Sequence, residues 1–264
     1  MNEITIAVVS VSVIGVLLAA MLSVASKVMA VEVDERFPLL REILPGANCG
    51  ACGFAGCDGY AQALVDDPTL KTNLCPPGGA TVIEQLSAAL GVAVEAAVPK
   101  VATVKCNGTC VNTTDKMEYA GEKTCVAAKI FYGGKGSCSH GCIGFGDCAK
   151  VCPYDAIYFK DGIACIDEQY CIGCAICATV CPSKVIEITP TASKVYVSCN
   201  SKDKGATARK NCKVACIACK KCEKACTAGA IVVENNLAKI DYELCTSCGA
   251  CVEGCPSKCI LIKA

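Results

Sequence analysis

The amino-acid sequence predicts an α+β protein in which one N-terminal transmembrane helix precedes small cysteine-rich modules of short strands and brief helices. Three observations predict this organisation. The segment 4–26 carries no charge, 27 of the 264 residues are cysteine, and the C-terminal half repeats itself after 74 residues. The predicted domains are an anchor over 1–30, a four-cysteine module over 31–80, a helix and linker over 81–105, and two tandem modules over 106–190 and 191–264.

The uncharged segment 4–26 is long enough to cross a bilayer. At about 1.5 Å per residue, a helix of this length spans roughly 35 Å. A cleaved signal peptide is the alternative, with a cleavage site at 28–30, but the residues before the segment include no Lys or Arg. Lys27 and Arg36 follow the segment. This positive charge predicts a single-pass protein of the cell (inner) membrane whose body lies on the cytoplasmic side.

The cysteines are clustered in tight runs, which favours shared metal binding over disulfide pairing. Thiolates that bind metal also agree with a reducing compartment. The single histidine, His140, excludes a His-rich zinc site and is interpreted as an exposed turn residue, although it could tune or ligate a cluster. The net charge is zero, so the chain as a whole is not predicted to bind nucleic acid.

The first module contains four cysteines in the pattern C-x2-C-x4-C followed by a distant fourth. They are Cys49, Cys52, Cys57 and Cys75. Glycines between the first three let backbone N–H groups turn toward the sulfurs, and a helix is expected over 59–67. This pattern predicts a [4Fe–4S] cluster, with a four-cysteine zinc site as the alternative. A further helix is expected through Val82, Leu86 and Leu90.

The remainder of the chain is an internal duplication. A shift of 74 residues places nine cysteines on nine others, from Cys125 on Cys199 to Cys181 on Cys255. Short strands are expected after Cys152 and Cys181. Each copy therefore predicts a two-cluster ferredoxin-like module, whose stability depends largely on cluster ligation.

The second copy has the regular spacing of a two-cluster ferredoxin, in which the fourth cysteine of each run ligates the other cluster. One predicted ligand set is Cys216, Cys219, Cys222 and Cys255. The other is Cys245, Cys248, Cys251 and Cys226.

The first copy is regular in only one of its halves. That half predicts a cluster held by Cys171, Cys174, Cys177 and Cys152. In the other half, Phe145 stands where a ligand is expected, and the predicted set is Cys138, Cys142, Cys148 and Cys181. A three-iron cluster, or a ligand from Cys106, Cys110 or Cys125, is the alternative to Cys138.

Five clusters use twenty cysteines, and seven remain. These are Cys106, Cys110, Cys125, Cys165, Cys199, Cys212 and Cys259. Buried structural thiols are the simpler interpretation, and a sixth cluster is the alternative. Cys165 and Cys259 lie in apolar, strand-like segments and are predicted to belong to the core.

The order of these parts, with the runs 48–57, 75–79 and 141–148, resembles the B subunit of the Rnf complex, the ion-translocating ferredoxin:NAD oxidoreductase of bacterial membranes. The resemblance implies a translocase subunit that accepts electrons from reduced ferredoxin. It would pass them to other membrane and NAD- or flavin-binding subunits, coupled to Na⁺ or H⁺ transport. The chain departs from the family in having Thr227 where proline is usual.

No dinucleotide-binding G-x-G-x-x-G motif opens a helix, so no complete active site is expected on this chain alone. The alternatives are a relay subunit of another oxidoreductase or hydrogenase complex, and a cluster-storage or scaffold protein.

Positive charge gathers in the segment 194–224, which contains nine Lys and Arg residues against two acidic ones. Because soluble ferredoxins are typically acidic, this surface is predicted to steer ferredoxin toward the second copy. The residues proposed for docking are Lys213, Lys220, Lys221 and Lys224. The alternatives are a solvated face and contact with anionic lipid.

Overall fold

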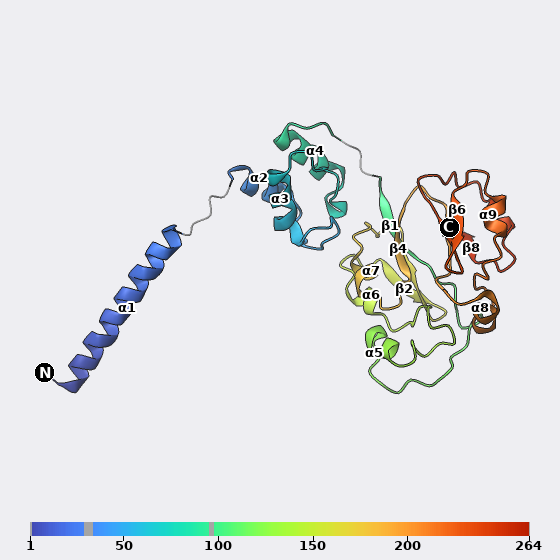
Figure 1. Ribbon diagram of the computed structural model, residues 1–264, viewed down its shortest axis with the longest axis horizontal. Helices are drawn as coiled ribbons and strands as arrows, with labels where there is room; N and C mark the ends of the chain where they lie inside the picture. Colours follow the sequence, from blue (N-terminus) through green and yellow to red (C-terminus); the bar gives the residue numbers. More distant parts are fainter. Residues whose placement is uncertain (1, 29–33, 95–97, 264) are drawn as a thin grey trace.

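A computed structural model of the chain describes residues 2–28, 34–94 and 98–263 (Figure 1). Helix α1 (Glu3–Val28) stands apart from the remainder at the N-terminal end. The apolar side chains of its central part, 11–24, are largely exposed; Leu17, for example, is 64% exposed. Within the described residues, no helix combines the length and the apolar character that a membrane span requires. The transmembrane helix predicted over 1–30 therefore stays a prediction.

The first module is a small helical unit around a buried tyrosine. Its elements are α2 (Arg36–Ile43), α3 (Gly56–Asp66), the 3-10 helix η1 (Pro76–Gly78) and α4 (Gly79–Leu90). Tyr60 is 1% exposed, stacks on Phe54 and donates a hydrogen bond to the carbonyl of Lys71 at 2.7 Å. Leu64 and Leu86 complete the core. The helices predicted over 59–67 and through Val82 are confirmed as α3 and α4.

The first ferredoxin-like module contains two antiparallel strand pairs and three short helices. The strands are β1 (Lys100–Val104), which pairs with β4 (Ile186–Pro190), and β2 (Ile157–Lys160), which pairs with β3 (Ile163–Ile166). The helices are α5 (Cys125–Ile130), α6 (Asp147–Lys150) and α7 (Ile176–Val180). The strands predicted after Cys152 and Cys181 are confirmed as β2 and β4.

The second ferredoxin-like module repeats this plan. The strands are β5 (Val195–Val197), which pairs with β8 (Ile260–Ile262), and β6 (Ile231–Glu234), which pairs with β7 (Leu237–Ile240). The helices are α8 (Gly205–Asn211), α9 (Lys221–Ala225) and α10 (Ala250–Glu253). The hairpin β6–β7 turns at Asn235 and Asn236, both with positive φ, as the tight turn between twisted strands requires.

Strand register shows where the two copies diverge. Val104 pairs with Ile186 in the first copy, and Val197 pairs with Ile260 in the second. The two isoleucines are 74 residues apart, whereas the two valines are 93 apart, so the first copy holds 19 more residues after its first strand. Cys106 and Cys199 each lie two residues beyond that valine. Cys106, and not Cys125, is therefore the structural counterpart of Cys199.

The register also moves a predicted boundary. The segment 81–105 is predicted above as helix and linker, with the first ferredoxin-like module beginning at 106. Its last part instead forms β1, which hydrogen-bonds along its whole length with β4. The described part of the module thus begins at Lys100, because backbone groups of β1 find their partners in that sheet.

The two ferredoxin-like modules lie side by side and are joined by hydrogen bonds (Figure 1). The backbone N–H of Asn107 donates to the carbonyl of Ser198 at 3.0 Å. The backbone N–H of Lys213 donates to the carbonyl of Asn112 at 2.9 Å. The Thr113 hydroxyl donates to the carbonyl of Asn211 at 2.8 Å. These contacts bring the loop after β1 against the loops that flank α8.

Candidate metal centres

The four cysteines of the first module line one cavity at the start of α3, together with Tyr60. Burial, with smaller contributions from the thiols of Cys57, Cys52 and Cys49, raises the pKa of Cys75 to about 11. This mutual effect follows from their closeness, since charging one thiol disfavours charging the next. The structure thus brings together the set predicted from the C-x2-C-x4-C run.

A left-handed glycine positions this loop. Gly56 has φ +87° and begins α3, and its missing side chain leaves room for Asn48. The Asn48 side-chain oxygen accepts a hydrogen bond from the backbone N–H of Cys57 at 2.8 Å. The bond fixes the third cysteine of the run relative to the first.

In the regular half of the first ferredoxin-like module, the predicted cysteines Cys152, Cys171, Cys174 and Cys177 line one cavity. Burial, with smaller contributions from the other three thiols, raises the pKa of Cys177 to about 12. The sulfur of Cys171 accepts a hydrogen bond from the backbone N–H of Ala102 at 3.3 Å. Strand β1 therefore contributes a donor to this site.

The irregular half of the same module forms a different cavity, which Cys142, Cys148 and Cys181 line together with Cys125. Burial raises the pKa of Cys142 and of Cys148 to about 11, and the thiol of Cys125 contributes to both shifts. Cys125 is buried at the first position of α5. The described structure thus surrounds this cavity with four thiols, one of them on the inserted segment of the first copy.

Cys138, the predicted fourth ligand of that set, lies elsewhere. It lines a larger cavity between the modules, with Cys106, Cys199 and Cys212, and Cys142 reaches both cavities. Phe145, which stands in the place of Cys219, packs beside Cys125 in a small apolar cluster. Cys125 is among the alternatives left open by the sequence, and the structure favours it over Cys138 because helix α5 carries it to the cavity.

In the second ferredoxin-like module, one cavity is lined by a complete predicted set, Cys216, Cys219, Cys222 and Cys255. Cys259 lines it too; it is 2% exposed, and its sulfur lies 3.6 Å from that of Cys255. A hydrogen bond from the Cys259 thiol lowers the pKa of Cys216. Cys259 is therefore a buried thiol, as predicted, but it also contacts two of the predicted ligands. The sequence gives no signal for that contact.

The last predicted set surrounds Cys251, whose pKa burial raises and the thiols of Cys245, Cys226 and Cys248 raise further. Cys226 follows α9 and the other three precede or lie within α10, and the two helices pack on each other. Cys248 is exposed. In both copies, the fourth cysteine of each run thus lies beside the other run. These cysteines are Cys152 and Cys181 in the first copy and Cys226 and Cys255 in the second.

The chemistry of these sites fits [4Fe–4S] clusters. Such a cluster is held by four cysteine thiolates, and each of these sites offers four thiols around a shared space. Cysteine binds metal as the thiolate, so cluster binding releases the thiol protons. Within the part of the chain that the structure describes, no group of three or more Cys, His, Asp and Glu side chains is arranged for a single metal ion.

The residues proposed for docking are all exposed, and three of them lie beside one of these sites. Lys220 and Lys221 follow Cys219, which is itself exposed, and Lys224 lies on α9. Lys213 is also exposed, and its ammonium donates to the carbonyl of Val111 in the first ferredoxin-like module at 3.1 Å. His140, expected as an exposed turn residue, is half-buried and contacts Asp203 at 3.3 Å.

Known families match the three cysteine-rich modules separately. A family model for an Fe-S cluster matches residues 44–77, and two models for a 4Fe-4S dicluster domain match residues 141–185 and 215–260. Each of the three matches covers cysteines that line the cavities described above.

Curated relatives match the chain over nearly its whole length. The B subunit of the Na(+)-translocating ferredoxin:NAD(+) oxidoreductase complex of Acetobacterium woodii is 44% identical, over 98% of this chain and 78% of the relative. The B subunit of the proton-translocating complex of Clostridium ljungdahlii is 42% identical, over 97% and 92%. The B subunit of an ion-translocating oxidoreductase complex of Methanosarcina acetivorans is 40% identical, over 95% of each chain.

Proposed function

This chain belongs to the family of B subunits of the ion-translocating ferredoxin:NAD(+) oxidoreductase complexes, and we propose that within such a complex it accepts electrons from reduced ferredoxin and relays them toward partner subunits. It is an electron-transfer subunit of that oxidoreductase, with ferredoxin-type 4Fe-4S domains. The single observation that carries the relay is the series of cavities, each lined by at least four cysteines.

We assign five [4Fe–4S] clusters to this chain. Four of the ligand sets are those predicted from the sequence, and in the fifth Cys125 joins Cys142, Cys148 and Cys181. When bound, the clusters supply one-electron redox chemistry and need no acid, base or nucleophile from the protein. The thiolates hold each cluster, and the exchanged cysteines tie the two halves of each module together. This exchange keeps neighbouring sites close.

The closeness of thiols in different sites gives the relay an order. Cys49 of the first module is near enough to Cys174 to raise its pKa, after the larger effect of burial. Within the next module, Cys177 acts in the same way on Cys148. The site of the first module therefore neighbours that of Cys174, which neighbours that of Cys148. This order runs from the N-terminal module into the first ferredoxin-like module.

Ferredoxin is proposed to dock on the second ferredoxin-like module, beside Cys219. An exposed ligand brings the edge of a cluster to the surface, where a soluble donor can approach it. Lys220, Lys221 and Lys224 place positive charge around it, where Lys220 pairs with Glu223, and Lys213 adds a fourth exposed positive charge. Complementary charge of this kind raises association rates between proteins.

Reversing the charge of Lys220, Lys221 and Lys224 to Glu is expected to slow reduction by ferredoxin about 10- to 100-fold at low ionic strength. Stopped-flow absorbance of the clusters, followed against salt concentration, measures the rate. The matched control reverses the exposed Lys116, Lys123 and Lys150, which give the same charge change on the first ferredoxin-like module. A rate that is independent of salt, or equal slowing in the control, would show that ferredoxin docks elsewhere.

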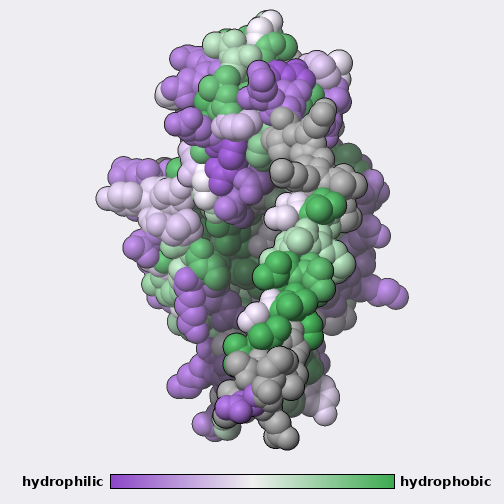
Figure 2. All heavy atoms as spheres, turned by 90° about the vertical axis from the view of Figure 1, so that its left-hand side faces the viewer, coloured by the Kyte–Doolittle hydropathy of each residue, from purple (hydrophilic) through white to green (hydrophobic). Residues whose placement is uncertain are grey.

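We also propose that α1 attaches the chain to the cell membrane, with the cluster-bearing modules on the cytoplasmic side. The exposed residues of α1 are mostly apolar, and the coloured part of the helix forms an almost continuous hydrophobic run (Figure 2). Water disfavours an apolar surface of this extent, and a lipid phase would bury it. Lys27 and Arg36, which follow the run, support the cytoplasmic placement.

Deletion of residues 1–30 is expected to release the chain from membranes. The full chain should sediment with membranes and resist extraction by alkaline carbonate, whereas the shortened chain should stay in the supernatant with its iron content unchanged. Recovery of the full chain in the supernatant, in the absence of its partner subunits, would contradict the proposed attachment.

A further inference from the structure

The largest described cavity lies between the two ferredoxin-like modules, and cysteines from both line it. Its volume is about 310 Å³. Cys106 and Cys138 come from the first ferredoxin-like module, and Cys199 and Cys212 come from the second ferredoxin-like module. The first two are half-buried and the last two are buried. None of the four belongs to the five ligand sets assigned above.

We propose that this cavity holds a sixth [4Fe–4S] cluster, ligated by Cys106, Cys138, Cys199 and Cys212, which links the two ferredoxin-like modules. The inference rests on the proposed function, because it adds a site to the same relay. It assigns a ligand role to three cysteines that are otherwise interpreted as structural thiols, and it moves Cys138 from one cluster to another.

The four thiols are close to one another in space. Burial, with smaller contributions from Cys142 and Cys138, raises the pKa of Cys106 to about 11. Burial likewise raises the pKa of Cys199 to about 11 and that of Cys212, and Cys138 contributes to both shifts. Cys138 is thus within electrostatic reach of each of the other three. This arrangement around a shared space resembles that of the other sites.

The backbone prepares two of these sulfurs as hydrogen-bond acceptors. The sulfur of Cys106 accepts from the N–H of Gly108 at 3.4 Å and from that of Cys142 at 3.3 Å. The sulfur of Cys199 accepts from the N–H of Ser201 at 3.5 Å and from that of Cys216 at 3.3 Å. Two donors aimed at one sulfur favour the thiolate, which is the form that binds iron.

The same pair of bonds relates the two copies by structure. Cys106 and Cys199 follow equivalent positions in β1 and β5, and each accepts from the first cysteine of the next cluster motif. The duplicated modules therefore present one equivalent cysteine each to the interface. Cys138 and Cys212, which are related by the 74-residue repeat, supply the second pair.

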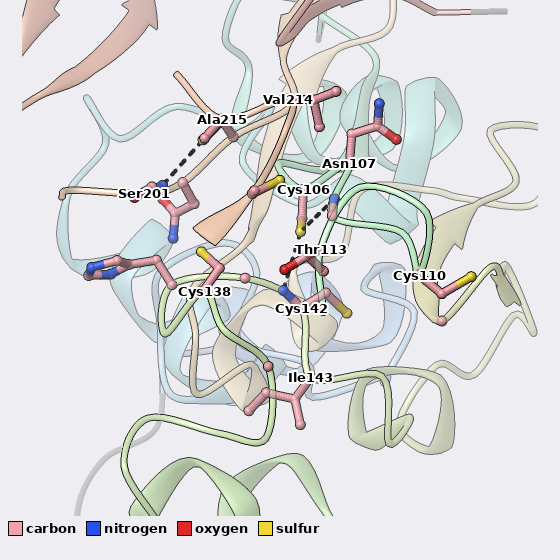
Figure 3. Close-up of a pocket in the computed structure, with 18 of the residues that line it drawn as sticks. Cys106, Asn107, Cys110, Thr113, Cys138, Cys142, Ile143, Ser201, Val214 and Ala215 are labelled. Carbon is pink, nitrogen blue, oxygen red and sulfur yellow. Dashed lines mark hydrogen bonds between the residues drawn. The ribbon is translucent and has the colours of Figure 1, made fainter. Parts of the chain in front are cut away.

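The other candidate ligands at this cavity are less suitable. Cys110 is exposed, and in Figure 3 it lies at the edge of the cavity, away from Cys106 and Cys138. Cys142 also lines the cavity of Cys125, Cys148 and Cys181, where it completes a set of four. His140 contacts Asp203 through Nε2, which engages that ring nitrogen.

The position of this cavity explains what a sixth cluster would add. Cys142 and Cys216 each belong to an adjacent ligand set, one in each module, and each donates its N–H to a sulfur of the interface site. The interface site therefore lies directly between the two ferredoxin-like modules. It would connect the docking face beside Cys219 with the order of sites that ends at Cys49.

Iron and sulfide analysis of the full chain, purified anaerobically, tests this proposal. Six clusters require about 24 iron atoms per chain, and five require about 20. Cys199→Ala and Cys212→Ala are each expected to lower the content by about four iron atoms and to leave the electron paramagnetic resonance (EPR) signals of the other clusters. The control Cys165→Ala changes a cysteine that lines none of the described cavities, and it should retain all the iron.

About 20 iron atoms in the wild-type chain, unchanged in both variants, would overturn the sixth cluster. One zinc atom per chain in place of four irons would do the same. The wild-type content decides the case if a variant unfolds and loses all its iron. A chain with about 20 irons that ferredoxin still reduces would leave the proposed function intact, so the two failures are distinguishable.

Discussion

Replacing Cys125 by alanine is expected to remove the cluster at Cys142, Cys148 and Cys181, with a loss of about four iron atoms per chain. The reason is geometric, because α5 places the Cys125 thiol in that cavity and within electrostatic reach of Cys142 and Cys148. Iron analysis and EPR of the anaerobically purified variant measure the loss. Ferredoxin should then reduce the clusters of the second ferredoxin-like module. The cluster of the N-terminal four-cysteine module, which lies beyond the missing cluster, should stay oxidised.

The internal repeat offers a rescue of this variant. Phe145 occupies the position of Cys219 in the second copy and packs beside Cys125. Phe145→Cys in the Cys125→Ala background is therefore expected to restore the missing ligand and the four irons. The variant for comparison carries Cys138→Ala together with Phe145→Cys. If Phe145→Cys restored the iron lost with Cys138 but not that lost with Cys125, Cys138 would be the ligand.

The second large effect is expected for the exchanged cysteines. Cys152→Ala should eliminate the cluster of Cys171, Cys174 and Cys177, and not the cluster nearer in sequence, with a loss of about four irons. Cys152 lines the cavity of those three residues although it ends the preceding cysteine run. Loss of that cluster removes the site beside Cys49, so NAD reduction by the assembled complex, driven by ferredoxin, should fall to background.

EPR of the reduced variant identifies which cluster is absent. The matched control is Cys165→Ala, because Cys165 belongs to the same module and lines none of the described cavities. The control should keep its iron content and most of its activity. Loss of the Cys142 cluster from Cys152→Ala, with the Cys171 cluster retained, would contradict the exchange of ligands.

The regular cysteine runs were predictable because their spacing alone determines how a short loop surrounds a cluster. Three predicted four-cysteine sets each line one cavity. They are the set of the first module, the set that contains Cys171 and the set that contains Cys216. The strands and helices next to these runs are also confirmed, since apolar segments of that length between glycines and prolines have few alternatives.

The irregular half of the first copy was not predictable in the same way. The 74-residue repeat aligns Cys125 with Cys199, but strand register makes Cys106 the counterpart of Cys199. A sequence comparison counts residues along the chain, whereas the inserted segment carries Cys125 to a different cavity from the one that Cys199 lines. Only the pairing of β1 with β4 and of β5 with β8 reveals the difference.

The cavity between the modules also lay beyond sequence reasoning. Its four thiols come from segments up to 106 residues apart, and no local run contains more than one of them. Long-range backbone contacts, such as that of Asn107 with Ser198, bring them together. Spacing motifs describe local loops, so a site assembled between two modules gives no motif.

The central claim is that this chain conducts electrons from ferredoxin through [4Fe–4S] clusters, and titration of the anaerobically purified full chain with reduced ferredoxin tests it most directly. EPR spectra recorded along the titration should show growing signals of reduced [4Fe–4S] clusters, broadened by interaction between neighbours. A chain whose clusters are reduced by dithionite but not by ferredoxin, or whose signals show isolated clusters only, would contradict the account.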